Sequence, residues 1–272
     1  MKNLTTRGIT GTLFVIVMVG ALWLGHFTFV LLFGFILAAS LLEFYLLADK
    51  MDVTTQKWPG ILLGLLTFAL TFLHAGNWIE FKWVMILLIS LVVVPLIEMA
   101  VKRKNPFQNI AYTLLGLGYI ALPLSCSNYL VFTDHSNQYS FQVLLRVFIL
   151  IWTYDTFAYL TGLIIGKHKL IERISPKKTW EGFFGGLLWS MIISWIIFKL
   201  TGTHTLQDWI TISLIVSITA TVGDLTESAL KRATQSKDSG KLMPGHGGIL
   251  DRFDGALFAI PSVFVYLQLF VF

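Results

Sequence analysis

The sequence predicts an all-α polytopic integral membrane protein, on three observations. Hydrophobic residues make up 56% of the 272 residues, charged residues make up 13%, and the mean hydropathy is +0.74. Apolar runs long enough to span a bilayer recur along the whole chain. No run alternates between apolar and polar residues as a membrane β-barrel requires, so helices are the structure that satisfies the backbone hydrogen bonds inside hydrocarbon.

Nine apolar runs predict about nine transmembrane helices. The runs are roughly 17 to 25 residues long, and they lie at about residues 8–25, 27–48, 59–74, 83–101, 109–126, 141–165, 180–200, 207–225 and 255–272. The first run follows a basic start typical of a signal peptide, but no small-residue cleavage site follows it, so we expect a retained helix. We expect one transmembrane domain over residues 1–272, in which 1–140 are mainly scaffold helices and 141–272 carry the catalytic helices and loops.

The basic residues predict a cytoplasmic N-terminus. Of the 20 lysines and arginines, all except Lys82, Arg146 and Lys199 fall on the inside in that orientation. Cytoplasmic loops of membrane proteins carry an excess of such residues. We therefore expect a multi-pass protein of the cytoplasmic membrane, whose active site lies at the cytoplasmic membrane edge. The net charge of +5 is explained by this orientation, and we expect no nucleic acid partner.

The most polar part of the chain lies between long apolar segments near its C-terminal end. It holds five basic and five acidic residues, namely Asp224, Glu227, Lys231, Arg232, Lys237, Asp238, Lys241, Asp251, Arg252 and Asp254. So many opposed charges beside a bilayer predict a metal and phosphate site. The single cysteine, Cys126, excludes an internal disulfide and argues against a thiolate metal cluster.

The end of the eighth predicted helix has a polar stripe. Asp224, Glu227, Ser228 and Lys231 are spaced i, i+3, i+4 and i+7, so they share one face if the helix continues into the cytoplasm. The stripe could hold a cation and an anion together; the alternative is a solvated helix end with internal ion pairs. Asp224 favours the first interpretation because Gly223 beside it allows close approach, and because a carboxylate there is costly unless it is paired or metal-bound.

Two aspartates precede the last predicted helix. Asp251 and Asp254 are three residues apart, and such hard oxygen ligands can take Mg²⁺, with Asp224 approaching from the preceding helix. Magnesium ions neutralise the charge that develops in phosphoryl and nucleotidyl transfer. The alternative is an acid pair that favours the N-terminal end of the helix dipole.

A turn rich in glycine lies between these charges. It contains Pro244, Gly245, His246, Gly247 and Gly248. Glycines let backbone amides approach a phosphate closely, and the imidazole can add a donor. The alternative is an ordinary turn.

A second basic loop lies before the seventh predicted helix, with Ser175, Lys177, Lys178 and Thr179 at its end. Hydroxyl groups, ammonium groups and a helix N-terminus together favour anion binding. The alternative is topogenic charge, with Ser175 or Thr179 capping the helix.

Four ionisable residues fall inside or near the predicted spans. Asp155 is a further site candidate, since an acid inside a helix usually faces a partner or a cavity. For Glu43, Glu98 and Arg146 we expect structural pairing.

The polar run resembles the signature of the phosphatidate cytidylyltransferases, also called CDP-diglyceride synthetases. The matching positions are Ser228, Leu230, Lys231, Arg232, Lys237, Asp238, Gly240, Pro244, His246, Gly247, Gly248, Ile249, Asp251, Arg252, Phe253 and Asp254. Met243 stands where the pattern usually has Leu, Ile or Phe. The likeness extends upstream to Asp155 and to the SPKKTWEG and GDLTES stretches.

This resemblance implies a reaction of CTP with phosphatidate in the bilayer to give CDP-diacylglycerol and pyrophosphate. It implies Mg²⁺ as the cofactor, held by Asp224 and Asp251 with Asp254 as a supporting or second ligand; a second metal or a monovalent cation stays open. The catalytic residues it implies are Asp224, Lys231, Asp251 and Asp254. The substrate-binding residues it implies are Asp155, Ser175, Lys177, Lys178, Thr179, Ser228, Arg232, Lys237, His246, Gly247, Gly248 and Arg252.

Two other functions compete with this one. A CTP-dependent kinase of the polyprenol or phytol type would use the same nucleotide with a different acceptor. A transporter would place its charges at the bilayer midplane, whereas here they concentrate at one edge. Oligomeric state stays open, although a membrane enzyme of this size often forms a homodimer.

Overall fold

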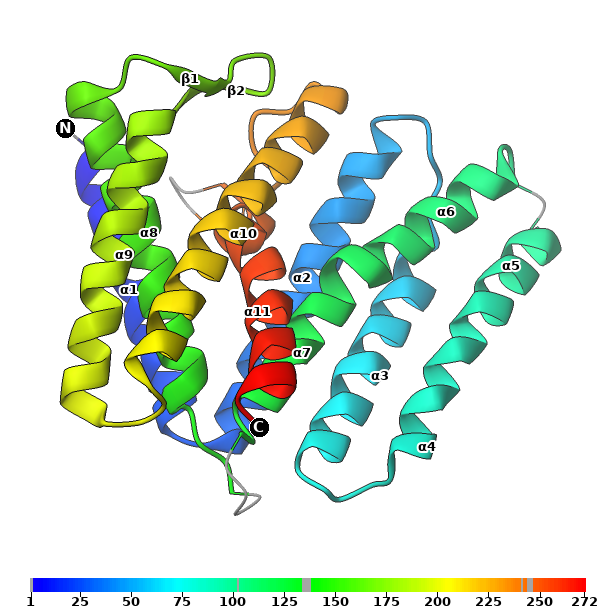
Figure 1. The fold of residues 1–272 in the computed structure, drawn as a ribbon. Helices are drawn as coiled ribbons and strands as arrows, with labels where there is room; N and C mark the ends of the chain where they lie inside the picture. Colours follow the sequence, from blue (N-terminus) through cyan, green and yellow to red (C-terminus); the bar gives the residue numbers. More distant parts are fainter. Residues whose placement is uncertain (1, 102, 134–137, 241, 244–246) are drawn as a thin grey trace. The chain divides into compact units, whose positions relative to one another are not determined.

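The computed structural model describes residues 2–101, 103–133, 138–240, 242–243 and 247–272, with side chains from residue 8 onward (Figure 1). Almost all of the described chain is helical. In chain order the elements are α1 Lys2–Trp23, α2 His26–Asp49, α3 Lys57–Ala75, α4 Phe81–Val84, η1 Met85–Ile89, α5 Ser90–Val101, α6 Pro106–Gly116, η2 Leu117–Ala121, α7 Leu122–Leu130, α8 Gln142–Ile165, β1 Lys169–Ile171, β2 Ser175–Thr179, α9 Trp180–Thr201, α10 Leu206–Ala233 and α11 Leu250–Phe270.

The predicted fold class is confirmed, since each of the nine apolar runs falls within helical structure. Within the described residues, 8 helical segments are long and apolar enough to cross a membrane: His26–Asp49, Lys57–Ala75, Phe81–Val101, Pro106–Leu130, Gln142–Ile165, Trp180–Thr201, Leu206–Ala233 and Leu250–Phe270. The apolar part of α1, Gly8–Trp23, is shorter. The chain is an all-α multi-pass membrane protein.

The structure differs from the sequence-based boundaries around the polar segments. Helix α10 continues to Ala233, as the polar stripe required, because good helix formers follow Ser228. Helix α11 begins at Leu250, so Asp251 lies in its first turn and not in a preceding loop. The second basic loop forms an antiparallel hairpin of β1 and β2, which was not expected because its strands are too short to give a periodic signal.

The helices form two compact units. The first comprises Met1–Phe141 with Ala233–Phe253, and the second comprises Gln142–Arg232 with Asp254–Phe272. The central part of the polar run therefore packs with the helices of the first half of the chain. The assignment of catalysis to residues 141–272 stays a prediction.

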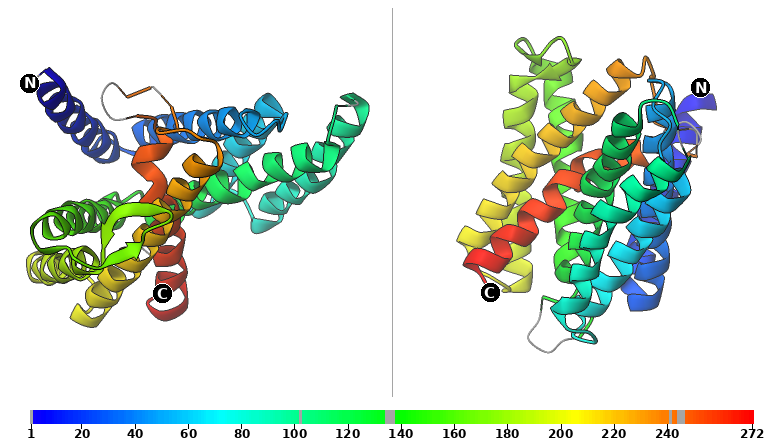
Figure 2. Two further views of the ribbon diagram at one scale, coloured as in Figure 1. Left: turned by 90° about the horizontal axis from the view of Figure 1, so that it is seen from above. Right: turned by 90° about the vertical axis from the view of Figure 1, so that its right-hand side faces the viewer.

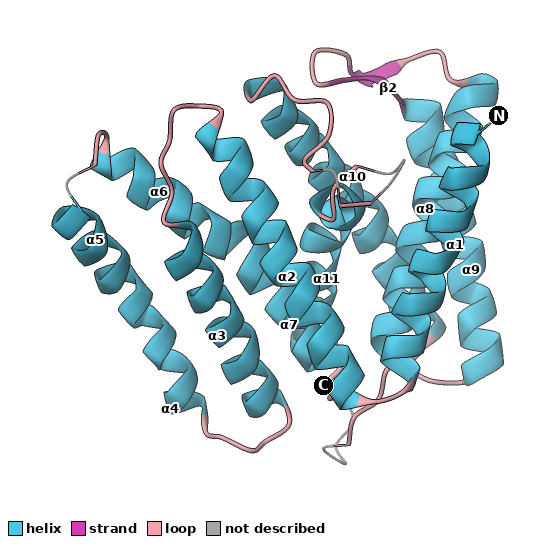
Figure 3. Cartoon of the chain, turned by 180° about the vertical axis from the view of Figure 1, so that it is seen from behind, coloured by secondary structure: helices cyan, strands magenta, loops and turns pink. Residues whose placement is uncertain are grey.

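In the first unit, α3 packs against α2, α7 and the α4–α5 segment (Figure 3). Its core is aromatic, with the ring of Phe29 lying 4.6 Å from Phe33 and 5.9 Å from Phe68 between centroids. Tyr45 of α2 donates a 3.0 Å hydrogen bond to the carbonyl of Thr113. The unit thus has a well-packed apolar core that fixes the direction of α2.

A buried polar network joins α5, α6 and the start of α3 in the same unit. Glu98 is fully buried and accepts hydrogen bonds from Gln56 Nε2 at 3.0 Å and from Asn109 Nδ2 at 2.6 Å. Arg103 approaches the same carboxylate at 3.8 Å. The expected structural pairing of Glu98 is confirmed.

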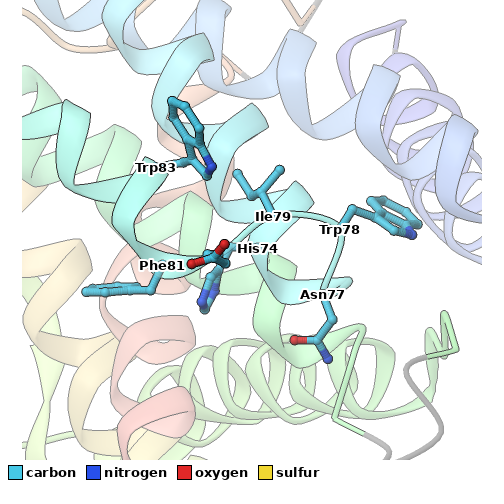
Figure 4. A pocket seen from close by; sticks show the side chains of 7 residues that line it. His74, Asn77, Trp78, Ile79, Phe81 and Trp83 are labelled. Atoms are coloured by element: carbon cyan, nitrogen blue, oxygen red, sulfur yellow. The ribbon is translucent and has the colours of Figure 1, made fainter.

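A cavity of about 460 Å³ lies at the connection between α3 and α4 (Figure 4). It is lined by His74, Asn77, Trp78, Ile79, Glu80, Phe81 and Trp83. Such clusters of aromatic residues are typical of the membrane interface.

In the second unit, α8 and α9 lie side by side and are joined by the hairpin at one end (Figure 1, Figure 2). Small residues allow this contact, since a Cβ added at Gly182 would lie 2.7 Å from the carbonyl oxygen of Ala158, and one at Gly186 would lie 2.8 Å from that of Tyr154. Small residues at helix contacts let membrane helices approach closely. The α8–α9 pair thus holds the hairpin on two tightly packed helices.

The opposite end of this pair is held by Arg146. Its guanidinium donates to Thr203 Oγ1 at 2.8 Å and lies 5.6 Å from the ring centroid of Trp209. The structural pairing expected for Arg146 is confirmed. The neighbouring His204 has a positive φ of 57° and is partly buried, and burial lowers the pKa of its imidazole.

Candidate active site

The predicted site residues separate into two clusters, one in each unit. The second unit holds Asp155, Ser175, Lys177, Lys178, Thr179, Asp224, Ser228, Lys231, Arg232 and Asp254. The first unit holds Lys237, Gly247, Gly248, Asp251 and Arg252. The predicted nucleotide contact His246 lies outside the described residues, as do its neighbours Pro244 and Gly245.

The cluster of the second unit is built on a close contact between α10 and α11. A Cβ added at Gly223 would collide with the backbone carbonyl of Asp254 and would lie 3.0 Å from the Cα atom of Gly255. A Cβ added at Gly255 would lie 3.2 Å from that of Ala220. The expectation that Gly223 allows close approach is confirmed, and the contact brings Asp224 and Asp254 to neighbouring points on the two helices.

Three carboxylates of this unit interact electrostatically. The charge of Asp254 is repelled by Asp224 and Asp155 and is attracted by Lys231. One oxygen of Asp254 accepts a 2.8 Å hydrogen bond from the N–H of Gly255. Repulsion between carboxylates in a medium of low dielectric constant is relieved when a cation binds near them.

Asp224 is tied to the hairpin by an ion pair. The ammonium group of Lys178 lies 2.6 Å from Asp224 Oδ2, and the hydroxyl of Ser228 donates to Oδ1 at 3.2 Å. The structure thus brings together a residue of the second basic loop and two residues of the polar stripe on α10. The ammonium group also places a positive charge where a phosphate could meet it.

The hairpin is fixed by two contacts at the start of α9. Thr179 is buried and accepts a 3.2 Å hydrogen bond from the N–H of Gly182, so it caps the helix. Glu181 accepts the backbone N–H groups of Lys167 and His168 at 3.1 Å and 3.2 Å. The capping alternative for Thr179 is the one observed, while Lys177 is exposed.

The C-terminal turns of α10 carry a buried ion pair. Lys231 Nζ lies 2.5 Å from a carboxylate oxygen of Glu227, whose side chain is 1% exposed. The alternative of a solvated helix end with internal ion pairs is thus half right, since the ion pair is present but Glu227 is buried. A catalytic role of Lys231 stays a prediction. Arg232 is exposed and donates from Nε to the carbonyl of Ile174 in the hairpin turn at 3.5 Å.

In the first unit, Asp251 folds back onto the polar run. Its Oδ2 atom accepts hydrogen bonds from the N–H groups of Ser239 at 2.9 Å and Gly248 at 2.7 Å. Gly247 has a φ of +85°, and a Cβ added there would lie 2.5 Å from the same oxygen. The sequence predicted that amides of this turn would meet a phosphate, whereas the Gly248 amide binds the aspartate of its own chain. Arg252 is exposed.

The structural pairing expected for Glu43 of α2 is confirmed, but the sequence does not place this residue in the cluster. Its carboxylate is 3% exposed and accepts hydrogen bonds from the N–H groups of Ile249 and Leu250 at 3.1 Å and 2.9 Å, and from the Ser239 hydroxyl at 3.2 Å. An acid within an apolar run was the available signal, but its partners lie about 200 residues further along the chain.

The side chains of the cluster in the second unit fit a divalent cation. Among the residues that the structure describes, no group of three or more His, Cys, Asp and Glu side chains could hold a metal ion. Asp224 and Asp254 nevertheless supply hard oxygen donors from the neighbouring points of two helices, and substrate phosphates usually complete the coordination of Mg²⁺. Asp251 belongs to the other unit, so its role as a ligand stays a prediction.

Known sequences resemble nearly the whole chain. The family described as the cytidylyltransferase family matches residues 5–270. A phosphatidate cytidylyltransferase of Staphylococcus aureus is 33% identical over 236 residues, which cover 84% of this chain and 88% of the relative. A protein of the same name from Staphylococcus epidermidis is 31% identical over 243 residues, covering 87% and 89%, and one from Staphylococcus saprophyticus is 32% identical over 238 residues, covering 85% and 88%.

The family match extends over the helices of both units and over the polar run. It is therefore not limited to a shared membrane-spanning composition. The chain belongs to the cytidylyltransferase family and is a nucleotidyltransferase.

Proposed function

We propose that this protein transfers the cytidylyl group of CTP to phosphatidate, releasing pyrophosphate and forming CDP-diacylglycerol. The relatives named as phosphatidate cytidylyltransferases support this substrate pair, because they match this chain over most of their own length. The structural observation that carries the proposal is the pairing of Lys178 with Asp224 beside Asp254. Opposed charges in this arrangement suit a cation and a phosphate held side by side.

The chemistry requires positioning and charge neutralisation more than a strong base. A phosphatidate oxygen is already anionic at neutral pH, so it can attack the α-phosphorus of CTP directly, and pyrophosphate leaves in line with the attack. Enzymes accelerate such steps by aligning the reactants and by placing positive charge where negative charge develops. These are the contributions that the described side chains can make.

Each candidate residue then has a role that follows from its charge and place. Asp224 and Asp254 would hold Mg²⁺, and the bound ion would neutralise charge on the phosphate oxygens. The phosphates would be bound by the basic residues Lys177, Lys178, Lys231, Arg232, Lys237 and Arg252. Asp251 as a further metal ligand, and the turn at His246–Gly248 as the nucleotide pocket, belong to the same proposal.

We further propose that the N-terminus and both polar segments face the cytoplasm, where CTP is present. The distribution of lysine and arginine supports this orientation in the cytoplasmic membrane. The acyl chains of phosphatidate would stay in the bilayer. A homodimer, a common state of membrane enzymes of this size, is an open alternative to a monomer that molar-mass measurement in detergent would test.

The test compares the fate of two labels. Purified protein in detergent receives phosphatidate, Mg²⁺ and CTP labelled at either the α- or the γ-phosphorus. We expect label in the lipid phase from α-labelled CTP only, and at least a hundredfold less with Asp224→Asn. Asp208→Asn is the matched control, since Asp208 lies near the opposite end of α10, where it binds Thr205 and Tyr266.

The competing kinase would give the reverse pattern. Transfer of γ-label to a prenol acceptor, with no α-label in the lipid phase, would overturn the proposal. Equal losses in Asp224→Asn and Asp208→Asn would overturn the assignment of Asp224 to the site.

A further inference from the structure

We propose that Glu43 is a positioning residue that holds Asp251 in place for the reaction. This inference deepens the proposed function and rests on it. It arises from the contacts of a residue in the part of the chain that the sequence marks as scaffold.

A buried carboxylate is costly unless its oxygens are satisfied. Glu43 is 3% exposed, and its observed hydrogen bonds go to Ser239, Ile249 and Leu250 of the polar run. Each of its two oxygens accepts a backbone N–H, and one accepts the hydroxyl as well. Hydrogen bonds to charged groups are roughly twice as strong as neutral ones. The cost of burying Glu43 is thus offset by fixing the start of α11 and the loop before it.

Glu43 and Asp251 hold the same two short segments. The backbone N–H of Ser239 donates to Asp251, whereas its hydroxyl donates to Glu43. The N–H of Gly248 donates to Asp251, and the next N–H along the chain, that of Ile249, donates to Glu43. Glu43 therefore binds the side chain of Ser239 and the two residues that follow Gly248, next to the amides that orient the Asp251 carboxylate. Groups that orient the ligands of a metal site in this way tune its affinity and activity.

Two glycines of the polar run leave space for the Glu43 side chain. A Cβ added at Gly240 would collide with the Glu43 carboxylate, lying 2.5 Å from its Cδ atom and 3.0 Å from Cγ. A Cβ added at Gly248 would lie 2.7 Å from Cδ. The φ of neither glycine falls in the left-handed region, so glycine is needed at position 240 because of contact with Glu43, and at position 248 because of contact with Glu43 and the Ser239 hydroxyl.

Helix α2 contacts the polar run at a second point. Lys50, which follows the end of α2, donates from Nζ to the Ser236 hydroxyl at 2.8 Å. Helix α2 and its C-cap thus contact the polar run at Ser236, Ser239, Ile249 and Leu250.

The first experiment measures the contact without relying on activity. Hydrogen exchange of the backbone amides at residues 249 and 250 is followed by mass spectrometry in wild type, Glu43→Gln and Glu98→Gln. The glutamine at position 43 presents N–H donors to groups that are themselves donors, so we expect exchange at least tenfold faster. Glu98→Gln removes the charge of an equally buried acid of the same unit that binds Gln56 and Asn109 instead, so exchange at 249 and 250 should be unchanged.

The second experiment measures cytidylyl transfer as a function of Mg²⁺ concentration. Replacing groups that orient metal ligands typically lowers metal affinity or activity by about 10- to 100-fold. We expect Glu43→Gln to raise the Mg²⁺ concentration for half-maximal rate by that factor, and Glu98→Gln to leave it within about twofold. A merely structural role would lower the amount of folded enzyme without moving this concentration.

A double-substitution test covers the case in which Glu43→Gln does not fold. Gly240→Ala should abolish transfer in the wild-type background because the new methyl group meets the Glu43 carboxylate. The shorter side chain of Glu43→Asp withdraws from that space, so adding Gly240→Ala there should reduce the rate by less than threefold. Additive losses would overturn the assigned contact.

The outcomes separate this inference from the proposed function. Unchanged exchange at residues 249 and 250 in Glu43→Gln would overturn the inference whatever the activity. Faster exchange with an unchanged Mg²⁺ dependence would also overturn it. Absence of cytidylyl transfer by folded wild type would instead overturn the proposed function, and the exchange experiment would still decide whether Glu43 holds the loop.

Discussion

At the residue scale, the carboxylates near the polar run differ in the partners they bind. Glu43 and Asp251 accept backbone N–H groups, Asp224 pairs with an ammonium group, and Asp254 faces other acids. A carboxylate bound by several N–H groups is held firmly, whereas one beside other carboxylates gains most from a cation. A bound cation would therefore relieve the most repulsion at the pair formed by Asp224 and Asp254.

Replacing Lys178, whose ammonium group pairs with Asp224, should slow the reaction. In Lys178→Gln the Asp224 carboxylate loses its 2.6 Å ion pair, and a charge near the phosphates is lost. We expect kcat/KM for CTP to fall by at least about tenfold, equivalent to about 1.4 kcal/mol of transition-state stabilisation. Steady-state kinetics with the purified enzyme would measure this.

The matched control is Lys169→Gln, since Lys169 is an exposed residue of the partner strand β1. Its rate should stay within twofold of wild type. Equal losses in both variants would point to general surface charge and not to the ion pair.

The partly buried His204 should make the stability of the protein depend on pH. Burial lowers its pKa below 6.5, the neighbouring Asp208 opposes this shift, and Arg146 adds to it. The unfolded chain therefore binds the proton more readily than the folded chain does. The free energy of unfolding thus has its full value above about pH 6.5 and decreases as the pH falls below that value. Thermal unfolding between pH 7.5 and 5.5 should show a falling midpoint.

The variant His204→Asn provides the comparison, because asparagine tolerates the positive φ of 57° at this position and does not titrate. Its midpoint should fall less over the same range. If the unfolding midpoint changed equally with pH in the two proteins, His204 would be excluded as the titrating group.

At the element scale, the close contact of α10 with α11 should be sensitive to added volume. Gly223→Ala would force a methyl group against the carbonyl of Asp254. The Asp254 carbonyl belongs to the backbone and cannot rotate aside as the end of a side chain can. The helices must therefore separate, and Asp224 must move. We expect a lower unfolding midpoint and a loss of transfer of at least tenfold.

Gly20→Ala is the matched control, since a Cβ at Gly20 of α1 meets nothing within 4 Å. It should keep the wild-type midpoint or raise it, because alanine favours the helix. An unaffected Gly223→Ala protein would show that the two helices do not depend on this contact.

At the element scale, the sequence predicts the positions of the helices but not all of their boundaries. The apolar runs located every long helix, and Gly223 marked a close approach, because hydropathy and small residues are local signals. The early start of α11 was missed because the Glu43 and Asp251 carboxylates bind N–H groups there, and such contacts leave no periodic pattern. The hairpin was missed since its strands are short. The metal and substrate roles stay predictions, because no pattern gives the distances between groups on different elements.

At the scale of the whole molecule, the basic residues predict one orientation in the membrane. In a Cys126→Ala background, Lys82→Cys should react with a membrane-impermeant maleimide on intact cells without their outer wall. Lys169→Cys should react only after the membrane is permeabilised, because the hairpin then faces the cytoplasm. Labelling in the opposite order would reverse the assigned orientation, and with it the access of the site to cytoplasmic CTP.

The order of the chain also matters for how the protein can be divided. The first compact unit is discontinuous, since it takes up Ala233–Phe253 after the chain has built most of the second unit. If the protein were produced as two fragments divided between Phe141 and Gln142, the first fragment would lack the segment that donates hydrogen bonds to Glu43. The second fragment would contain this segment without the helix that it contacts. We expect neither fragment to be an independent folding unit, because Glu43 gains its hydrogen-bond partners only when residues 239–250 are present.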